Sequence, residues 1–113
     1  MATICAAHGV QDVVIAPGSR SAPITLAFVR HKGFNCHTVI DERSAGYVAL
    51  GIAQQSKRPV VIICTSGTAA LNLSPALAEA MYSQVPIIAL TADRPAAWIN
   101  QDDGQSIQQS HIF

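Results

Sequence analysis

The sequence predicts an α/β fold, a doubly wound and mainly parallel sheet with helices on both faces. Four short runs rich in Val and Ile alternate with segments of helix length along the 113 residues. None of these runs shows a clean alternation of polar and apolar residues. Strands that are apolar on both sides belong in a sheet covered on both sides, as parallel sheets are. Helix and strand alternate along the chain, which predicts right-handed βαβ units.

The expected elements follow one another without a low-complexity linker. Strands are predicted for residues 12–16, 37–40, 59–65 and 86–92, helices for residues 21–31, 42–56 and 68–82, and the last turns of an earlier helix for residues 2–8. Each of the three full helices has a start signal. Ser21 precedes a first turn that contains Pro23, and Asp41 and Ser66 stand just before the other two helices. Ser and Asp at such positions cap free backbone N–H groups.

The pattern changes after residue 92. Residues 93–110 are polar, with Pro95, Asn100, Gly104 and several glutamines, and are expected to form a loop with one short helix. The sequence ends at Phe113 without a further strand. A four-stranded sheet that ends in a polar tail predicts that residues 1–113 are part of a domain whose last strands are absent.

Composition narrows the possible functions. Seven Lys and Arg balance seven Asp and Glu, so the basic surface of a nucleic-acid-binding protein is not expected. No apolar run approaches the roughly 20 residues of a membrane span. The three cysteines, Cys5, Cys36 and Cys64, form no C-x-x-C pair, which favours a reducing cytoplasm over a disulfide scaffold. Neither the cysteines nor the histidines have the spacing of a zinc site, and no metal ligands are predicted in this chain.

Four polar segments follow the predicted strands, at residues 17–21, 41–43, 65–68 and 92–95. Ligands of open α/β sheets bind beyond the carboxyl ends of the strands, so these segments are expected to converge on one rim. The rim would carry Arg20, Glu42 and Arg94 with several hydroxyls, which suits a charged small molecule. Taken singly, none of these segments is specific for a ligand, and a turn, a helix cap or a solvated charge is the more typical interpretation.

Familiar nucleotide and hydrolase motifs are missing. The sequence has no G-x-G-x-x-G, no G-x-x-x-x-G-K-[ST] and no G-x-S-x-G. A hydrolase that pairs Ser19 or Ser66 with one of the four histidines remains an alternative, although the spacing of these residues in the sequence does not favour such a pair.

The strings at the strand ends resemble a known family. They are Ala-Pro-Gly-Ser-Arg-Ser at 16–21, Asp-Glu-Arg-Ser-Ala-Gly at 41–46, Thr-Ser-Gly-Thr-Ala at 65–69 and Leu-Thr-Ala-Asp-Arg-Pro at 90–95. Together they resemble the pyrimidine-binding domain of thiamine-diphosphate enzymes, and within that family the synthases of menaquinone biosynthesis. The resemblance covers essentially all 113 residues.

The resemblance implies a function for the complete protein. It implies a homo-oligomeric transferase that uses thiamine diphosphate and Mg²⁺ or Mn²⁺, with the metal ligands outside this chain. The enzyme would decarboxylate 2-oxoglutarate and add the succinyl group to isochorismate, and the chain alone would be inactive. Another thiamine-diphosphate decarboxylase or ligase, and a binding module of the same fold without chemistry, remain alternatives.

The resemblance also implies roles for individual residues. Glu42 matches the catalytic glutamate, whose carboxyl group hydrogen-bonds the pyrimidine N1′ of the cofactor. Thr65, Ser66 and Gly67 would meet the pyrimidine with backbone groups. Substrate carboxylates would be bound by four residues, Ser19, Arg20, Arg94 and Gln105. Gly104 departs from the family pattern, which has a polar residue such as asparagine there.

Overall fold

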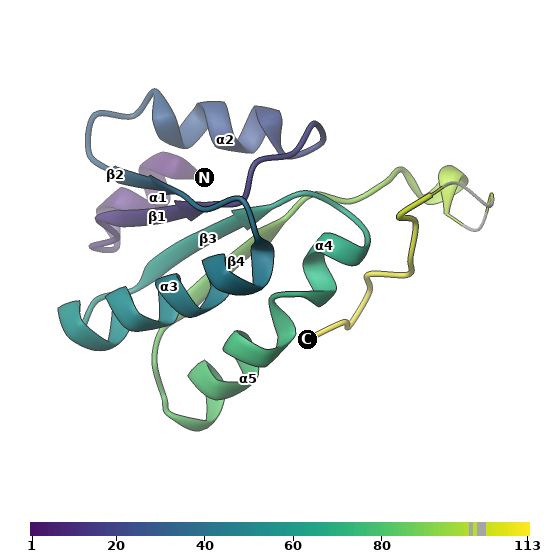
Figure 1. Cartoon of the computed structure of the whole chain (residues 1–113). Helices are drawn as coiled ribbons and strands as arrows, with labels where there is room; N and C mark the ends of the chain where they lie inside the picture. The colour runs from purple at the N-terminus through teal and green to yellow at the C-terminus, as the bar shows by residue number, and fades with distance from the viewer. Residues whose placement is uncertain (100, 102–103) are drawn as a thin grey trace.

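A computed structural model, which describes residues 1–99, 101 and 104–113, confirms the predicted fold class. Four parallel strands form one sheet in the order β2-β1-β3-β4. Helices α1 and α2 lie on one face of this sheet, and α3, α4 and α5 lie on the other (Figure 1). The chain is therefore a three-layer α/β/α unit.

The elements alternate as the sequence predicts. The strands are β1 (Asp12–Ile15), β2 (Asn35–Thr38), β3 (Val60–Cys64) and β4 (Ile87–Thr91). The helices are α1 (Ala2–Ala7), α2 (Ala22–Val29), α3 (Glu42–Ser56), α4 (Thr68–Leu71) and α5 (Ser74–Tyr82), followed by the 3₁₀ turn η1 (Ala96–Trp98). The loop expected at residues 93–110 contains η1, and its residues 100, 102 and 103 lie outside the described residues.

The central strands β1 and β3 are buried on both faces. Val13, Ile15, Val61 and Ile63 pack with Phe28 of α2 on one side of the sheet. The intervening residues of the same strands face α3, α4 and α5 in a second core, which includes Val14, Ile62, Cys64, Ala49 and Leu73. Side chains of a strand alternate between faces, so a continuous Val/Ile run fills both cores.

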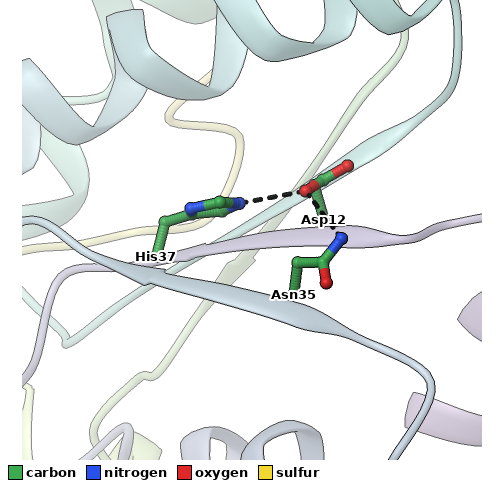
Figure 2. A network of polar contacts seen from close by, with 3 residues as sticks. All are labelled: Asp12, Asn35 and His37. Carbon is green, nitrogen blue, oxygen red and sulfur yellow. Dashed lines mark hydrogen bonds and ion pairs between the residues drawn. The ribbon is translucent and has the colours of Figure 1, made fainter.

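The edge strand β2 differs from its prediction in position and in burial. It spans residues 35–38 instead of 37–40, and all four of its residues are exposed. The Asp12 carboxylate of β1 is the centre of a polar network, in which His37 Nε2 lies 2.9 Å and Asn35 Nδ2 lies 3.4 Å from Asp12 Oδ1 (Figure 2). The backbone N–H of Asn35 also donates to the Gln11 carbonyl at 2.8 Å. Together these contacts make Asn35 the first residue of β2 that pairs with β1. Sequence hydrophobicity could not find a polar edge strand.

The helix predicted for residues 68–82 is two helices. Pro75 lacks the backbone N–H that would bond the carbonyl of Leu71, so a continuous helix cannot pass this point. Helix α4 accordingly ends at Leu71 and α5 begins at Ser74, with Pro75 in its first turn.

Only one of the three expected helix caps is formed. Asp41 caps α3 by accepting the Ser44 N–H at 2.7 Å, as predicted. Ser21 has helical backbone angles and its hydroxyl donates to the Gly18 carbonyl at 3.0 Å, so it does not cap α2. Ser66 is not the cap of α4 either, because that position belongs to Gly67 with a φ of 78°.

The C-terminal segment, residues 104–113, folds back over the helical layer. It runs past α4 and ends beside α5, where Ile112 and Phe113 line a groove with Leu77 and Met81 (Figure 1). None of the helices in the described part of the chain is long and apolar enough to cross a membrane.

Candidate functional site

The polar segments after the four strands meet at one edge of the sheet, as predicted, because all four strands are parallel. Strand β1 lies between β2 and β3, so the connections that follow β1 and β2 run to opposite faces of the sheet. Crevices at such a switch point are the ligand sites of open α/β sheets. The site is therefore expected where the loop after β1 meets the loop after β3.

Those two loops are in direct contact. A Cβ atom added to Gly18 would overlap the side chain of Thr65, its Oγ1 included at 2.9 Å. Only glycine lets the backbone after β1 approach Thr65 this closely. Ser21 is fully buried, and its hydroxyl donates a hydrogen bond to the Gly18 carbonyl. The turn at residues 17–21 thus packs against Thr65, the residue that follows β3.

Glu42 is the first residue of α3 and is half-buried on this rim. The cap formed by Asp41 fixes the backbone just before it, and the hydrogen bond from the Ser44 amide lowers the pKa of the Asp41 carboxyl. Cys64, the last residue of β3, is fully buried. Its burial and, second, the negative charge of Glu42 raise the pKa of the Cys64 thiol to about 12. The Glu42 carboxylate therefore lies within electrostatic reach of the end of β3.

The turn at residues 65–67 is enclosed. Thr65 is half-buried, and Ser66 and Gly67 are buried. Gly67 adopts φ 78°, which L side chains rarely adopt, and a Cβ here would also overlap the Gln105 carbonyl. The Gly67 N–H donates to Gln109 Oε1 at 2.5 Å. The structure thus brings Gln105 against Gly67, two residues that the sequence analysis assigned separately.

The two candidate arginines have different surroundings. Arg94 is 7% exposed, and its Nη2 donates to the Gly104 carbonyl at 2.5 Å, which ties the end of β4 to the C-terminal segment. Ser19 and Arg20 are exposed in the turn after β1, and neither forms a side-chain hydrogen bond within the described part of the chain. Arg20 is therefore available to a ligand from solvent, whereas Arg94 already holds the loop.

Two site residues escaped the sequence analysis. Gln109 lies in a glutamine-rich polar segment, a composition typical of a solvated tail, yet it is buried. Cys64 was considered only for disulfide and metal roles, although its place one residue before the Thr-Ser-Gly string puts it at the rim. No sequence signal distinguishes Gln109 from its neighbour Gln108.

The rim suits an aminopyrimidine better than a metal ion. It offers a half-buried carboxyl at Glu42 and backbone groups at residues 65–67. Among the described residues, no three His, Cys, Asp or Glu side chains are grouped so that they could hold a metal ion.

The arrangement defines a three-layer α/β domain with a polar ligand rim at its β1/β3 switch point. The family model for the thiamine pyrophosphate enzyme, N-terminal TPP binding domain, matches residues 1–112. Thiamine pyrophosphate is another name for thiamine diphosphate. The chain belongs to this family.

Three similar curated proteins carry the name 2-succinyl-5-enolpyruvyl-6-hydroxy-3-cyclohexene-1-carboxylate synthase. The relative from Flavobacterium johnsoniae is 50% identical over 110 residues, which is 97% of this chain and 20% of the relative. That from Cytophaga hutchinsonii is 55% identical over 106 residues, 94% of this chain and 19% of the relative. That from Bacteroides fragilis is 55% identical over 107 residues, 95% of this chain and 19% of the relative. The chain thus spans about a fifth of the length of these relatives.

Proposed function

We propose that this chain is the pyrimidine-binding part of a thiamine-diphosphate-dependent 2-succinyl-5-enolpyruvyl-6-hydroxy-3-cyclohexene-1-carboxylate synthase of menaquinone biosynthesis. Residues 1–113 would form part of one domain, and the diphosphate- and metal-binding residues would lie elsewhere in the protein. The whole enzyme, meaning the full-length protein that contains this sequence, would decarboxylate 2-oxoglutarate and transfer the succinyl group to isochorismate.

One observation carries the proposal. Glu42 is half-buried at the start of α3, within electrostatic reach of the end of β3, in a chain about half identical to synthases of this name. A carboxyl group at such a position can share a proton with one nitrogen of an aromatic ring. Backbone groups of the neighbouring turn at residues 65–67 would meet the edge of that ring.

Each cofactor-binding residue has a distinct task in this proposal. Bound thiamine diphosphate supplies the acidic carbon that attacks 2-oxo acids and retains the electron pair released by decarboxylation. The Glu42 carboxyl holds a proton at the pyrimidine N1′ and thereby acts as a general acid–base group. Backbone groups of Thr65, Ser66 and Gly67 orient the pyrimidine edge.

The substrates are anionic, and the proposal assigns their carboxylates to the outer rim. Arg20 is exposed to a ligand from solvent, and its planar guanidinium is well suited to a carboxylate. Ser19 adds a hydroxyl beside it. Arg94 and Gln105 approach from the loop after β4, and the bond from Arg94 to Gly104 keeps that loop in place.

The remaining features of the proposal concern the assembled enzyme. Mg²⁺ or Mn²⁺ would bind with the cofactor diphosphate, outside this chain. A homo-oligomer is supported by large apolar side chains exposed on the helices, among them Tyr47, Leu71, Met81 and Tyr82. A cytoplasmic location is supported by three free cysteines, of which Cys36 is exposed.

The test is a product assay with the whole enzyme. Purified protein is incubated with 2-oxoglutarate, isochorismate, thiamine diphosphate and Mg²⁺, and the products are identified by mass spectrometry. The proposal predicts release of CO₂ and a product that carries the succinyl group on the isochorismate ring. Decarboxylation of a different 2-oxo acid would favour another enzyme of the family, and cofactor binding without turnover would favour a non-catalytic module.

A further inference from the structure

The side-chain amide of Gln109 bridges the ends of β3 and β4. Its Oε1 accepts the backbone N–H of Gly67 at 2.5 Å, and its Nε2 donates to the backbone carbonyl of Ala92 at 2.9 Å. Gln109 is 9% exposed and Ala92 is 7% exposed, so both bonds lie away from water. Gln109 stands 42 residues from Gly67 and 17 from Ala92 in the sequence. The two bonds therefore join three separate segments of the chain.

The bridge continues the pairing of β3 with β4 beyond the sheet. The Ala92 N–H donates to the Cys64 carbonyl at 3.1 Å, next to the last rung of the ladder. The Gln109 amide then links the following backbone groups, Gly67 N–H and Ala92 C=O. A primary amide offers an acceptor and a donor at once, whereas a carboxylate offers acceptors only and a thioether lacks the N–H donor. Glutamine is thus matched to both partners.

The bridge also holds the C-terminal segment on the turn at residues 65–67. The Gln105 carbonyl lies so close to Gly67 that no Cβ would fit between them. Arg94 fixes the start of the same segment through the Gly104 carbonyl. The positions of Gly67, Arg94 and Gln105 therefore depend on one segment, and Gln109 is its buried anchor.

We infer that Gln109 is a positioning residue of the thiamine-diphosphate site, which it serves by locking the pyrimidine-binding turn at residues 65–67 to the end of β4. The inference rests on the proposed function. Gln109 acts through Gly67 and Ala92 and is not itself a catalytic residue. Without its amide, a buried N–H and a buried carbonyl lose their partners, and the turn moves to regain hydrogen bonds from water.

The first test needs no cofactor and measures the bridge itself. Hydrogen exchange of the Gly67 amide is compared in the whole enzyme, in Gln109→Met and in Gln108→Met. Gln108 is the exposed neighbour of Gln109 and serves as the matched control. Loss of the bond should speed exchange at Gly67 by about tenfold in Gln109→Met, and Gln108→Met should match the wild type. Equal exchange in all three proteins overturns the inference.

The second test measures the site. Thiamine diphosphate is titrated into the same three proteins in the presence of Mg²⁺, at a temperature where all are folded, and KM and kcat are then measured with 2-oxoglutarate. A displaced turn should raise the Kd for the cofactor by about tenfold in Gln109→Met and lower kcat at saturation. If Gln109→Met lowers only the unfolding temperature and leaves Kd, KM and kcat unchanged, Gln109 has a structural role and the inference is wrong.

A second variant, Gln109→Glu, is used if Gln109→Met does not fold. Gln109→Glu keeps the length of the side chain and the acceptor for Gly67 but loses the donor to Ala92, and Gln108→Glu is its control. The same rise in Kd is expected. A wild type that binds no thiamine diphosphate would overturn the proposed function and this inference together. A wild type that binds it, with Gln109 variants that bind it equally well, would overturn this inference alone.

Discussion

Glu42 is the residue on which the proposed chemistry depends most. In Glu42→Gln the side chain keeps its shape but cannot exchange a proton, so turnover of the whole enzyme should fall by about 10²–10⁴-fold while thiamine diphosphate still binds. Turnover is measured after a titration has shown that the variant is saturated. Glu79→Gln, on the exposed surface of α5, is the matched control. Near wild-type turnover in Glu42→Gln would remove Glu42 from the mechanism.

Replacing either arginine by alanine should weaken substrate binding, but only one of the two variants should also be less stable. Loss of a charge-assisted hydrogen bond costs about 1.5–3 kcal/mol, which is a rise of roughly 10- to 150-fold in KM. Arg20→Ala should raise KM for a substrate without lowering the unfolding temperature, because Arg20 is exposed. Arg94→Ala should do both, because it also removes the bond to Gly104.

Steady-state kinetics and thermal unfolding of both variants test this prediction. Arg58→Ala is the control, since Arg58 is exposed and precedes β3, at the opposite edge of the sheet. Normal substrate kinetics with weakened cofactor binding would mean that the arginines serve the cofactor instead.

The three thiols should react very differently. Cys36 is exposed on β2, whereas Cys5 and Cys64 are buried. Partial desolvation of its sulfur raises the pKa of Cys36, and burial with the charge of Glu42 raises the pKa of Cys64 to about 12. The thiolate is the reactive form, so the rate of labelling should increase with pH and Cys64 should stay unlabelled at pH 8. Iodoacetamide labelling followed by peptide mass spectrometry should find Cys36 alone, and rapid labelling of native Cys64 would contradict the described burial.

At the level of the elements, the contact between the loops after β1 and β3 can be tested with two glycines. Gly18→Ala places a methyl group against Thr65, and overpacking of this kind costs about 1–3 kcal/mol. Gly51 lies inside α3 with open space around its Cα, so Gly51→Ala should stabilise the helix by about 1 kcal/mol. In thermal unfolding, Gly51→Ala should have the highest midpoint, the wild type an intermediate one and Gly18→Ala the lowest. A Gly18→Ala protein as stable as the wild type would show that the loops are not packed as described.

Local signals predicted the elements well where they were strong. Helix α3 has the predicted bounds because Asp41 caps its start and Lys57, in the left-handed conformation, ends it. The split between α4 and α5 follows from Pro75 and was available in the sequence, but the apolar pattern on both sides concealed it. The bounds predicted for β2 were two residues too late, because its pairing depends on the Asp12 network, which joins residues more than twenty positions apart in the sequence.

At the level of the whole molecule, the class of fold and the shared edge of the four strand ends were predictable, and the contacts between the loops at that edge were not. Parallel strands that alternate with helices bring their carboxyl ends to one rim whatever the strand order. The closeness of Gly18 to Thr65 and of Gly67 to Gln105 depends on which strands are neighbours and on where the C-terminal segment returns. Gln109 could not be predicted as buried, because a glutamine that bridges two strand ends and a glutamine in a solvated tail look the same in the sequence.

A structure of the whole enzyme with thiamine diphosphate and Mg²⁺ bound tests most directly whether Glu42 binds the pyrimidine of the cofactor. In that structure we expect a Glu42 carboxylate oxygen about 2.7–3.2 Å from the pyrimidine N1′, with the backbone of residues 65–67 along the ring. We also expect the diphosphate and the metal ion to contact none of residues 1–113. A pyrimidine bound away from Glu42, or a metal ion held by residues 1–113, would contradict these expectations.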